Sequence, residues 1–433
     1  MSHAQELAEA VRRFAGIDLP VGVKAWDGSA AGPQDGPVVV LNNSRALRWL
    51  MWYPAELALA HAYVSGDLDV IGDLGEGLRR VWKAVGANGG RRPAAQRGRG
   101  WLAAVRLAVR LGVVGPKPQA PSATADLEGE VNSPERDRAA IGHHYDLSNR
   151  FYGLLLDPRM AYSCAYWTED GPGYGLEEAQ RDKLDLVCRK LGLRPGSRLL
   201  DIGCGWGSLT LHAASKYRAK VTAITLSAQQ HAHVSGRVAE LGLGGLVDVR
   251  HLDWRLSPEG EYDAVATIEM GEHVGERNYP AFAEFLRSRL RPGGRLLVQQ
   301  MSRAAGTAPG GGPFIETYIA PDMHMRPVGR TVDLIESAGL EVRDVEAMRE
   351  HYVRTVDVWI NTLEDRWGDF AALAGEETAR VWRLYLVGGR LAFEQGRMGV
   401  DQILAVRPDA VGAVSVPPTR RWMTADLGEV RDV

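Results

Sequence analysis

Apolar residues follow two alternating patterns over the second two thirds of the chain. From about residue 138 onward, short apolar runs alternate with longer segments in which apolar residues recur at helical spacing. Short runs of this kind predict strands, and the longer segments predict helices. Strands are predicted at 198–202, 220–225, 248–252, 262–268, 295–300, 341–348 and 402–407, with helices between most of them, for example at 176–191 and 226–241. This alternation predicts an α/β fold with a mostly parallel, doubly wound sheet of about seven strands.

The first part of the chain is less regular, with a predicted strand at 38–41 and a predicted helix at 54–65. Residues 83–117 then contain eight lysines and arginines, and no acidic residue follows until Asp126. Within this basic segment, 101–111 has helical spacing that places Arg106 and Arg110 on one stripe. Such a helix can lie on anionic lipid. A core or interdomain helix beside a solvated basic loop explains the same pattern.

Prolines and serines are concentrated at 116–137, where no hydrophobic period is visible. Because 433 residues exceed one ordinary domain, we place a boundary there. The sequence predicts an N-terminal domain at 1–115, a linker at 116–137 and a second domain at 138–433. Within the second domain, we expect the glycine-rich 306–312 to form a mobile loop, and the segment from there to Arg330 to form a lid over the site.

Composition and charge narrow the class of protein. An apolar fraction of 45% is ordinary for a soluble protein, and a net charge of -3 argues against a nucleic-acid partner. Three cysteines do not suggest a disulfide framework, so we expect a cytoplasmic protein. The first residues lack the basic and apolar regions of a signal peptide, and no apolar stretch approaches the roughly 18 residues that span a bilayer. Any membrane contact is therefore expected to be peripheral, and no metal site is expected.

The most informative motif overlaps the predicted strand at 198–202. Residues 199–207 read Leu-Leu-Asp-Ile-Gly-Cys-Gly-Trp-Gly. The glycines allow positive φ angles and a close approach of a ligand to the main chain. The spacing Asp-x-Gly-x-Gly-x-Gly differs from the dinucleotide fingerprint, and it resembles motif I of the class I S-adenosylmethionine (SAM) methyltransferases. A tight turn in some other α/β protein is the alternative.

Three later strand ends fit the same ligand. The second strand ends in Thr225 and Leu226, followed by Gln230, where the cofactor ribose would lie. The third ends in an acid and an aromatic residue, Asp253 and Trp254, which can flank adenine. The fourth strand delivers its carboxyl end to the reacting centre. A tryptophan like Trp254 is more often a core residue, but the order and spacing of the three features favour SAM.

These residues resemble the cyclopropane fatty acid synthase family of SAM-dependent methyltransferases. The similarity covers nearly the whole chain and is most specific at 143–359. It is carried by 144–149 (His-Tyr-Asp-Leu-Ser-Asn), 160–167 (Met-Ala-Tyr-Ser-Cys-Ala-Tyr-Trp), the glycine motif, 225–230, 271–275 (Gly-Glu-His-Val-Gly) and 351–352 (His-Tyr). Residues 56–67 also resemble the full-length bacterial synthases, which carry an extra lipid-facing domain. The resemblance therefore implies an N-terminal α+β domain that faces lipid or membrane and can form a dimer.

The resemblance implies that SAM is the cofactor. The residues expected to bind it are Tyr162, Ser163, Asp201, Gly203, Gly205, Thr225, Leu226, Gln230, Asp253, Trp254 and Ile268. Family members also hold a bicarbonate ion beside the SAM methyl group, whose neighbours here would be Cys164, Glu272 and Tyr352. Methyl transfer to a carbon–carbon double bond leaves a carbocation, so a base is needed in a dry pocket. The ion can remove the proton, while Glu272 orients the ion or accepts the proton in turn.

Two residues depart from the family pattern. Gln299 stands where the family usually has a histidine that contacts bicarbonate, and Glu269 stands where it has a glycine three residues before the motif glutamate. Both changes resemble the branch that makes 10-methylene fatty acids. Repulsion between Glu269 and Glu272 raises one of the two pKa values and can create a second base. A surface or capping role for Glu269 is the alternative.

The expected activity is methyl transfer from SAM to the double bond of an oleoyl-type chain in a phospholipid, giving a 10-methylene branch. A cyclopropane product, a small-molecule methyltransferase and a catalytically silent lipid-binding protein are the alternatives. The expected partners are an unsaturated acyl phospholipid in an anionic membrane, a second copy of the chain and a separate flavin- or NADPH-type reductase. The expected location is the cytoplasm, at the inner face of the cell membrane.

Overall fold

The computed structural model describes residues 1–87, 105–124, 129–133, 136, 148–257, 260–414 and 416–424. The chain divides into two compact units. The first comprises Met1–Thr124 and Arg366–Leu391, and the second comprises Ala125–Asp365 and Ala392–Val433. The division therefore differs from the one expected from sequence, because a segment near the C-terminus joins the N-terminal unit. Of the predicted helix at 101–111, residues 105–110 are helical, and 101–104 lie outside the described residues.

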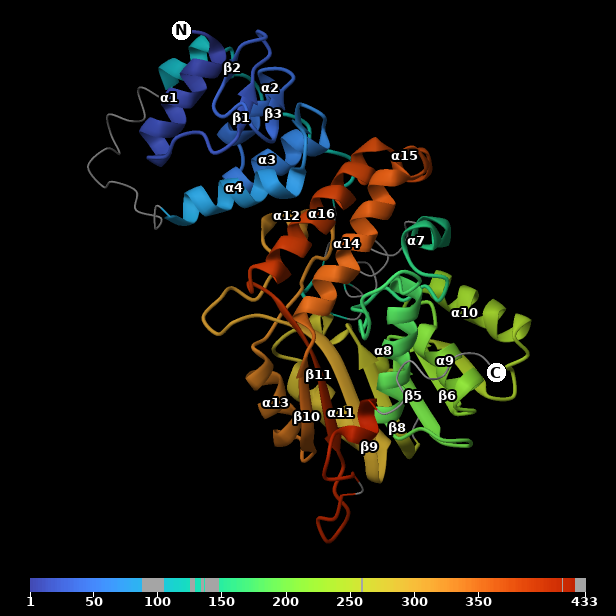
Figure 1. The fold of residues 1–433 in the computed structure, drawn as a ribbon. Helices are drawn as coiled ribbons and strands as arrows, with labels where there is room; N and C mark the ends of the chain where they lie inside the picture. Colours follow the sequence, from blue (N-terminus) through green and yellow to red (C-terminus); the bar gives the residue numbers. More distant parts are fainter. Residues whose placement is uncertain are drawn as a thin grey trace. The chain divides into compact units, whose positions relative to one another are not determined.

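The second unit is built on a seven-stranded sheet with the order β10-β11-β9-β8-β5-β6-β7 (Figure 1). Strand β11 is antiparallel to both of its neighbours, and the other pairs are parallel. The predicted doubly wound α/β fold is confirmed. The strands are β5 (Arg198–Ile202), β6 (Lys220–Thr225), β7 (Val247–His251), β8 (Tyr262–Ile268), β9 (Leu290–Ser302), β10 (Glu341–Ala347) and β11 (Gly399–Val406).

The predicted strand bounds hold for β5, β6 and β8 and shift by a few residues elsewhere. The largest shift is in β9, which begins at Leu290 rather than 295. Its first residues include Pro292, Gly293 and Gly294, a sequence typical of a turn. The ladder between β8 and β9 changes register at this place, which lets the strand continue through it.

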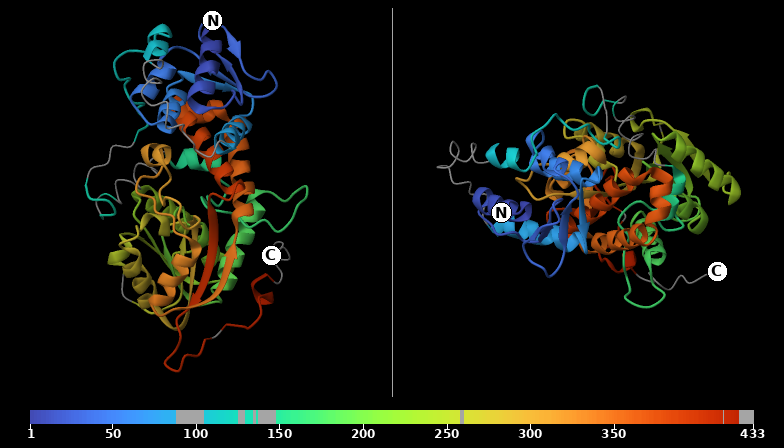
Figure 2. Two further views of the ribbon diagram at one scale, coloured as in Figure 1. Left: turned by 90° about the vertical axis from the view of Figure 1, so that its left-hand side faces the viewer. Right: turned by 90° about the horizontal axis from the view of Figure 1, so that it is seen from above.

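Helices cover both faces of this sheet (Figure 1, Figure 2). On one face lie α8 (Leu176–Lys190), α9 (Ser208–Lys216) and α10 (Ala228–Glu240), whose apolar side chains form one core with β5 and β6. On the other face, α11 (Tyr279–Arg289) and α13 (Val328–Ser337) form a second core. The remaining elements of this unit are α7 (Asn149–Leu155), η3 (Trp254–Leu256), η4 (Gly271–His273), α12 (Pro313–Tyr318), α14 (Arg349–Asp365) and α17 (Arg421–Thr424).

The first unit has a smaller sheet of four strands in the order β2-β1-β3-β4, with helices from both ends of the chain. Helix α16 is held there by Arg380, which pairs with Asp69 at 3.1 Å, and by Arg383, which donates to the hydroxyl of Tyr63 at 3.0 Å. The elements are α1 (His3–Ala15), β1 (Gly22–Lys24), β2 (Ala30–Ala31), β3 (Val38–Leu41), α2 (Arg45–Arg48), η1 (Trp49–Met51), α3 (Ala55–Val64), β4 (Leu68–Ile71), α4 (Leu74–Ala87), α15 (Trp367–Ala374) and α16 (Glu376–Glu394).

Candidate active site

A cavity opens at the carboxyl ends of the central strands of the second unit. The loops that follow β5, β6, β7 and β8 form most of its wall, as expected for a doubly wound sheet. All eleven residues that the sequence assigned to SAM border this cavity: Tyr162, Ser163, Asp201, Gly203, Gly205, Thr225, Leu226, Gln230, Asp253, Trp254 and Ile268. Pro321 and Asp322, from the segment expected to form a lid, border it as well.

The glycine motif makes the sharp turn from β5 into α9. Gly203 has a φ of 75°, a left-handed conformation that disfavours other residues. A β-carbon on Gly203 would lie 2.9 Å from Cγ of Met270, so the position is also too crowded for a side chain. Asp201 lies just before the turn, buried, and its carboxylate accepts a hydrogen bond of 2.6 Å from the hydroxyl of Thr210. Burial raises the pKa of Asp201 to about 6.

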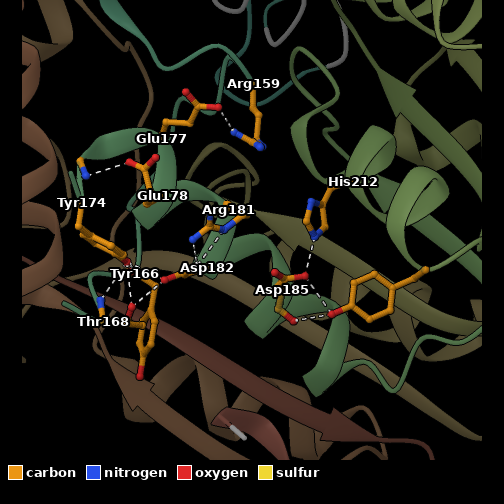
Figure 3. A network of polar contacts seen from close by, with 12 residues as sticks. Arg159, Tyr166, Thr168, Tyr174, Glu177, Glu178, Arg181, Asp182, Asp185 and His212 are labelled. Carbon is orange, nitrogen blue, oxygen red and sulfur yellow. Dashed lines mark hydrogen bonds and ion pairs between the residues drawn. The ribbon is translucent and has the colours of Figure 1, made fainter. Parts of the chain in front are cut away.

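The segment that carries Tyr162, Ser163 and Cys164 is fastened to α8 by polar contacts. Thr168 and Tyr174 both donate to Asp182 at 2.7 Å, and Arg159 pairs with Glu177 at 2.8 Å (Figure 3). These bonds hold the irregular segment before α8 against that helix. The backbone beside the cavity is thereby fixed without secondary structure of its own.

Lys183 is a pocket residue that the sequence analysis missed. It is buried on α8, borders the cavity, and donates to the hydroxyl of Ser163 at 2.8 Å. One turn earlier, Gln180 donates to the carbonyl of Ser163 at 2.8 Å. A lysine is rarely buried without a partner. The sequence did contain a signal for this role, because Gln180 and Lys183 are two polar residues, three positions apart, on the buried face of a predicted helix.

Glu269 follows β8 and points its carboxylate into the centre of the predicted catalytic cluster. Its Oε1 accepts hydrogen bonds of 2.8 Å from the backbone N–H of Cys164 and from Nε2 of Gln299. Its Oε2 accepts a hydrogen bond of 2.6 Å from the hydroxyl of Tyr352. Glu269 has a φ of 52°, in the left-handed region that favours glycine. This agrees with the glycine expected at this position from the family pattern. The surface or capping alternative for Glu269 is therefore wrong.

The expectation of a bicarbonate ion needs correction. Cys164, Tyr352 and Gln299 stand where the ion's contacts were expected, and each of the three donates to the carboxylate of Glu269 instead. A carboxylate and a bicarbonate ion both present oxygen acceptors with a negative charge, so one can replace the other in this set of donors. A separate ion does not fit the same donors while Glu269 holds them.

Glu272 lies beside this cluster but has different partners. Its Oε1 accepts a hydrogen bond of 2.5 Å from the backbone N–H of Met301, and its Oε2 has no partner among the described residues. Burial, and then repulsion from Glu269, raise the pKa of Glu272 to about 8. Burial also raises the pKa of Glu269, but hydrogen bonds, led by that of Tyr352, oppose the rise. Glu269 accepts three hydrogen bonds that favour its charged form, whereas the carboxylate of Glu272 accepts one, so Glu269 is the carboxyl of the pair that ionises more readily.

Cys164 acts through its backbone. Burial raises the pKa of its thiol well above the usual value, so the thiolate is not formed near neutral pH. The sulfur donates to the carbonyls of Ala165 and Met348, at 3.3 and 3.6 Å. The contribution of Cys164 to the cluster is therefore the N–H that it gives to Glu269.

Comparison with known proteins identifies the family of this chain. The family described as mycolic acid cyclopropane synthetase matches residues 132–403. The chain belongs to this family. It is 37% identical to the probable fatty acid methyltransferase Rv3720 of Mycobacterium tuberculosis over 410 residues, 93% of this chain and 95% of that protein. It is 33% identical over 287 residues to the tuberculostearic acid methyltransferase UfaA1 of Mycobacterium tuberculosis, covering 64% of this chain and 66% of UfaA1.

Among solved structures, the mycolic acid cyclopropane synthase CmaA1, complexed with SAH and CTAB, matches with a TM-score of 0.58 and 33% identity. The match covers 62% of this chain and 98% of that one. The chain is a SAM-dependent methyltransferase of the cyclopropane synthase family. The turn at Gly203, which exposes main chain to the cavity, and the apolar Leu226, Leu252 and Trp254 in its wall fit the two ends of that cofactor. Among the residues described by the structure, no cluster of three or more histidine, cysteine or carboxylate side chains is arranged to hold a metal.

Replacing Gly203 by valine tests this assignment. The variant combines a strained φ with contact between its side chain and Met270, so SAM affinity is expected to fall at least about tenfold, a loss of roughly 1.4 kcal/mol. Titration calorimetry measures the affinity. Gly196→Val is the matched control, because Gly196 also has a positive φ of 83° and lies outside the cavity wall. Equal SAM affinity in both variants would contradict the assignment.

Proposed function

We propose that the protein transfers the methyl group of SAM to the double bond of an oleoyl-type chain in a phospholipid and leaves a 10-methylene branch. The observation that carries the proposal is the carboxylate of Glu269, held by three donors at the centre of the catalytic cluster. The similarity to a probable fatty acid methyltransferase and to a tuberculostearic acid methyltransferase supports a fatty acyl substrate.

Addition of a methyl group to an alkene creates the need for a base. When bound, SAM supplies an electrophilic methyl group. The alkene's π electrons form the new carbon–carbon bond, and the neighbouring chain carbon becomes a cation. A proton must then leave, and Glu269 is the charged acceptor in the cluster. With a pKa of about 8, Glu272 is neutral near pH 7 and adds no second negative charge beside Glu269. Glu269 is therefore left as the base.

The position of the base decides between two products. Loss of a proton from the new methyl group at once closes a three-membered ring. If a hydride first moves from the branch carbon to the neighbouring cation, loss of a proton from the same methyl group leaves an exocyclic methylene. We propose that Glu269, at its fixed position after β8, favours the hydride shift and the exocyclic methylene product. A methylene branch becomes a methyl branch only by addition of hydride and a proton, which is the role proposed for a separate flavin- or NADPH-type reductase.

Glu269→Gln is expected to lower turnover by about 10²–10⁴-fold, because the amide cannot accept the proton. SAM affinity should stay near that of the wild type. Glu272→Gln is the matched control: it exchanges a carboxyl that is neutral below a pKa of about 8 for a neutral amide, so its loss at pH 7 should be much smaller. Both are measured as methyl transfer to oleoyl lipid. An active Glu269→Gln enzyme would rule out Glu269 as the base.

Glu269→Gly tests the base and the product together. The glycine leaves the N–H of Cys164, the amide of Gln299 and the hydroxyl of Tyr352 without their shared acceptor. Added bicarbonate or formate is expected to restore part of the activity, and the restored product should move toward cyclopropane, more so with Gln299→His. A tenfold change in product ratio requires only about 1.4 kcal/mol between the two barriers.

Gas chromatography with mass spectrometry of the fatty acids measures the ratio. Glu269→Gln is the control, because its amide still occupies the position of the carboxylate. Added anions should therefore not restore the activity of this variant. A wild-type enzyme that makes only cyclopropane would contradict the methylene product, and so would an unchanged ratio in the variants.

We also propose that the first unit contacts an anionic membrane peripherally. No helix among the described residues is long and apolar enough to cross a bilayer. Leu50, Met51 and Trp52 are consecutive and exposed, at 43%, 48% and 47%. The segment 105–118 lies next to them, since Arg48 donates to the carbonyl of Val113 at 2.9 Å. Residues 45–53 and 105–118 contain five basic residues and no acid. Arg45 pairs with Asp67 and Arg110 with Glu6, so the charges of Arg48, Arg106 and Lys117 are those that complement anionic lipid.

Replacing Leu50, Met51 and Trp52 together by serine is expected to weaken sedimentation with vesicles of dioleoyl phosphatidylglycerol several-fold, because apolar insertion is lost. Leu256→Ser is the control, since Leu256 is 75% exposed in the second unit. Activity on detergent-dispersed lipid should not change in either variant. Unchanged sedimentation would contradict the proposed membrane contact.

A further inference from the structure

A row of buried polar side chains extends from Glu269 away from the cavity. Nε2 of Gln299 donates to Glu269 at 2.8 Å, and Oε1 of Gln299 accepts from Nε2 of Gln402 at 2.9 Å. Oε1 of Gln402 in turn accepts from the ammonium of Lys190 at 2.9 Å. Gln299, Gln402 and Lys190 are each fully buried. Such groups are costly to bury unless every one of them is paired, so the row needs a reason to exist.

Strand register builds the row. Gln299 on β9 lies directly opposite Gln402 on β11, and Gln402 lies directly opposite Glu346 on β10. On the other side, Gln299 is the register partner of Ile268, the residue before Glu269. Side chains alternate between the faces of a sheet, so a slip of one residue in any of these strands would remove a member of the row.

The chemistry of the two ends fixes the direction of every hydrogen bond between them. An ammonium group only donates, so Gln402 must turn its oxygen to Lys190 and its NH₂ to Gln299. Gln299 must then turn its oxygen to Gln402 and its NH₂ to Glu269. An ionised carboxylate only accepts, so the far end demands the same direction. Without the lysine, only the charge on Glu269 opposes the reverse direction, in which both amides are rotated by half a turn and a protonated Glu269 donates to the carbonyl oxygen of Gln299.

We propose that Lys190 is a positioning residue that acts through Gln402 and Gln299 to keep an N–H donor directed at Glu269, so that Glu269 stays ionised and ready to take the proton. This inference rests on the proposed role of Glu269 as the base. It assigns a task in the reaction to a lysine on α8 that does not border the cavity.

The other charged and titratable groups around the row are consistent with this role. Lys190 also contacts Glu346 at 2.5 Å and Asp344 at 3.5 Å. These carboxylates balance the charge of the ammonium group, which still donates to Gln402. Glu269 faces Tyr352, Cys164, Lys183 and Glu272. None of these groups donates to Gln299, so the hydrogen bond to its amide oxygen comes from Gln402.

Gln402→Met tests the relay while leaving Lys190 with Glu346 and Asp344. Loss of the donor frees Gln299 to rotate, and Glu269 loses a hydrogen bond to its charged form, which raises its pKa. Because the base must be ionised, the acid limb of the pH profile of turnover should move to higher pH by about one unit, and turnover on that limb should fall about tenfold. SAM affinity and the thermal midpoint serve as checks on folding.

Three further variants separate positioning from structure. Lys190→Met should move the acid limb in the same direction. Lys190→Arg keeps a group that only donates, so its acid limb should lie where that of the wild type lies. Glu346→Gln is the matched control: it removes a charged partner of Lys190 and should leave the limb in place.

Two outcomes would overturn the proposals, and they can be told apart. A folded Gln402→Met enzyme with the wild-type pH profile, alongside an inactive Glu269→Gln enzyme, would refute the relay alone. An active Glu269→Gln enzyme would refute the base itself.

Discussion

The second unit depends on how it accommodates one carboxylate. Glu269 lies deep at the end of β8, and a buried charge is tolerated only with several hydrogen bonds. Its donors come from the segment before α8, from β9 and from α14. These elements must be correctly packed before the charge is satisfied, so the cluster and the tertiary fold require each other.

The same carboxylate explains two unusual features of the site. Glu269 adopts a left-handed φ, a strained conformation for a residue other than glycine, and strain of this kind is commonly found at functional sites. Glu272, only three residues later, has its pKa raised to about 8. Two neighbouring carboxylates cannot both be charged at low cost, and the donors decide which one is. A carboxylate attached to the main chain has one position, whereas a bound ion can be exchanged.

The chemistry and the proposed membrane contact lie in different units. Every residue of the cavity wall and of the polar row belongs to the second unit, and the exposed apolar residues Leu50, Met51 and Trp52 belong to the first. Arg380 and Arg383 tie α16 to the first unit, so that unit is completed by residues from late in the chain.

The sequence by itself determined the sheet and the cofactor loop. Strands β5, β6 and β8 were predicted to the residue, because their signal is a local run of apolar residues. The glycine motif is equally local, since its turn is made by neighbours in the chain. Nine of the eleven expected cofactor residues lie together because the carboxyl ends of parallel strands share one edge. The other two, Tyr162 and Ser163, belong to the segment that Gln180 and Lys183 hold against α8.

Only the tertiary structure decided which groups surround Glu269. Its donors lie 105, 30 and 83 residues away along the chain, and no local pattern joins residues so far apart. The sequence therefore left a bicarbonate ion, a second base and a capping role all open. Lys190 and Gln402 were not singled out for the same reason: their link to the site runs through strand register and the packing of α8, which are fixed only when the sheet is complete.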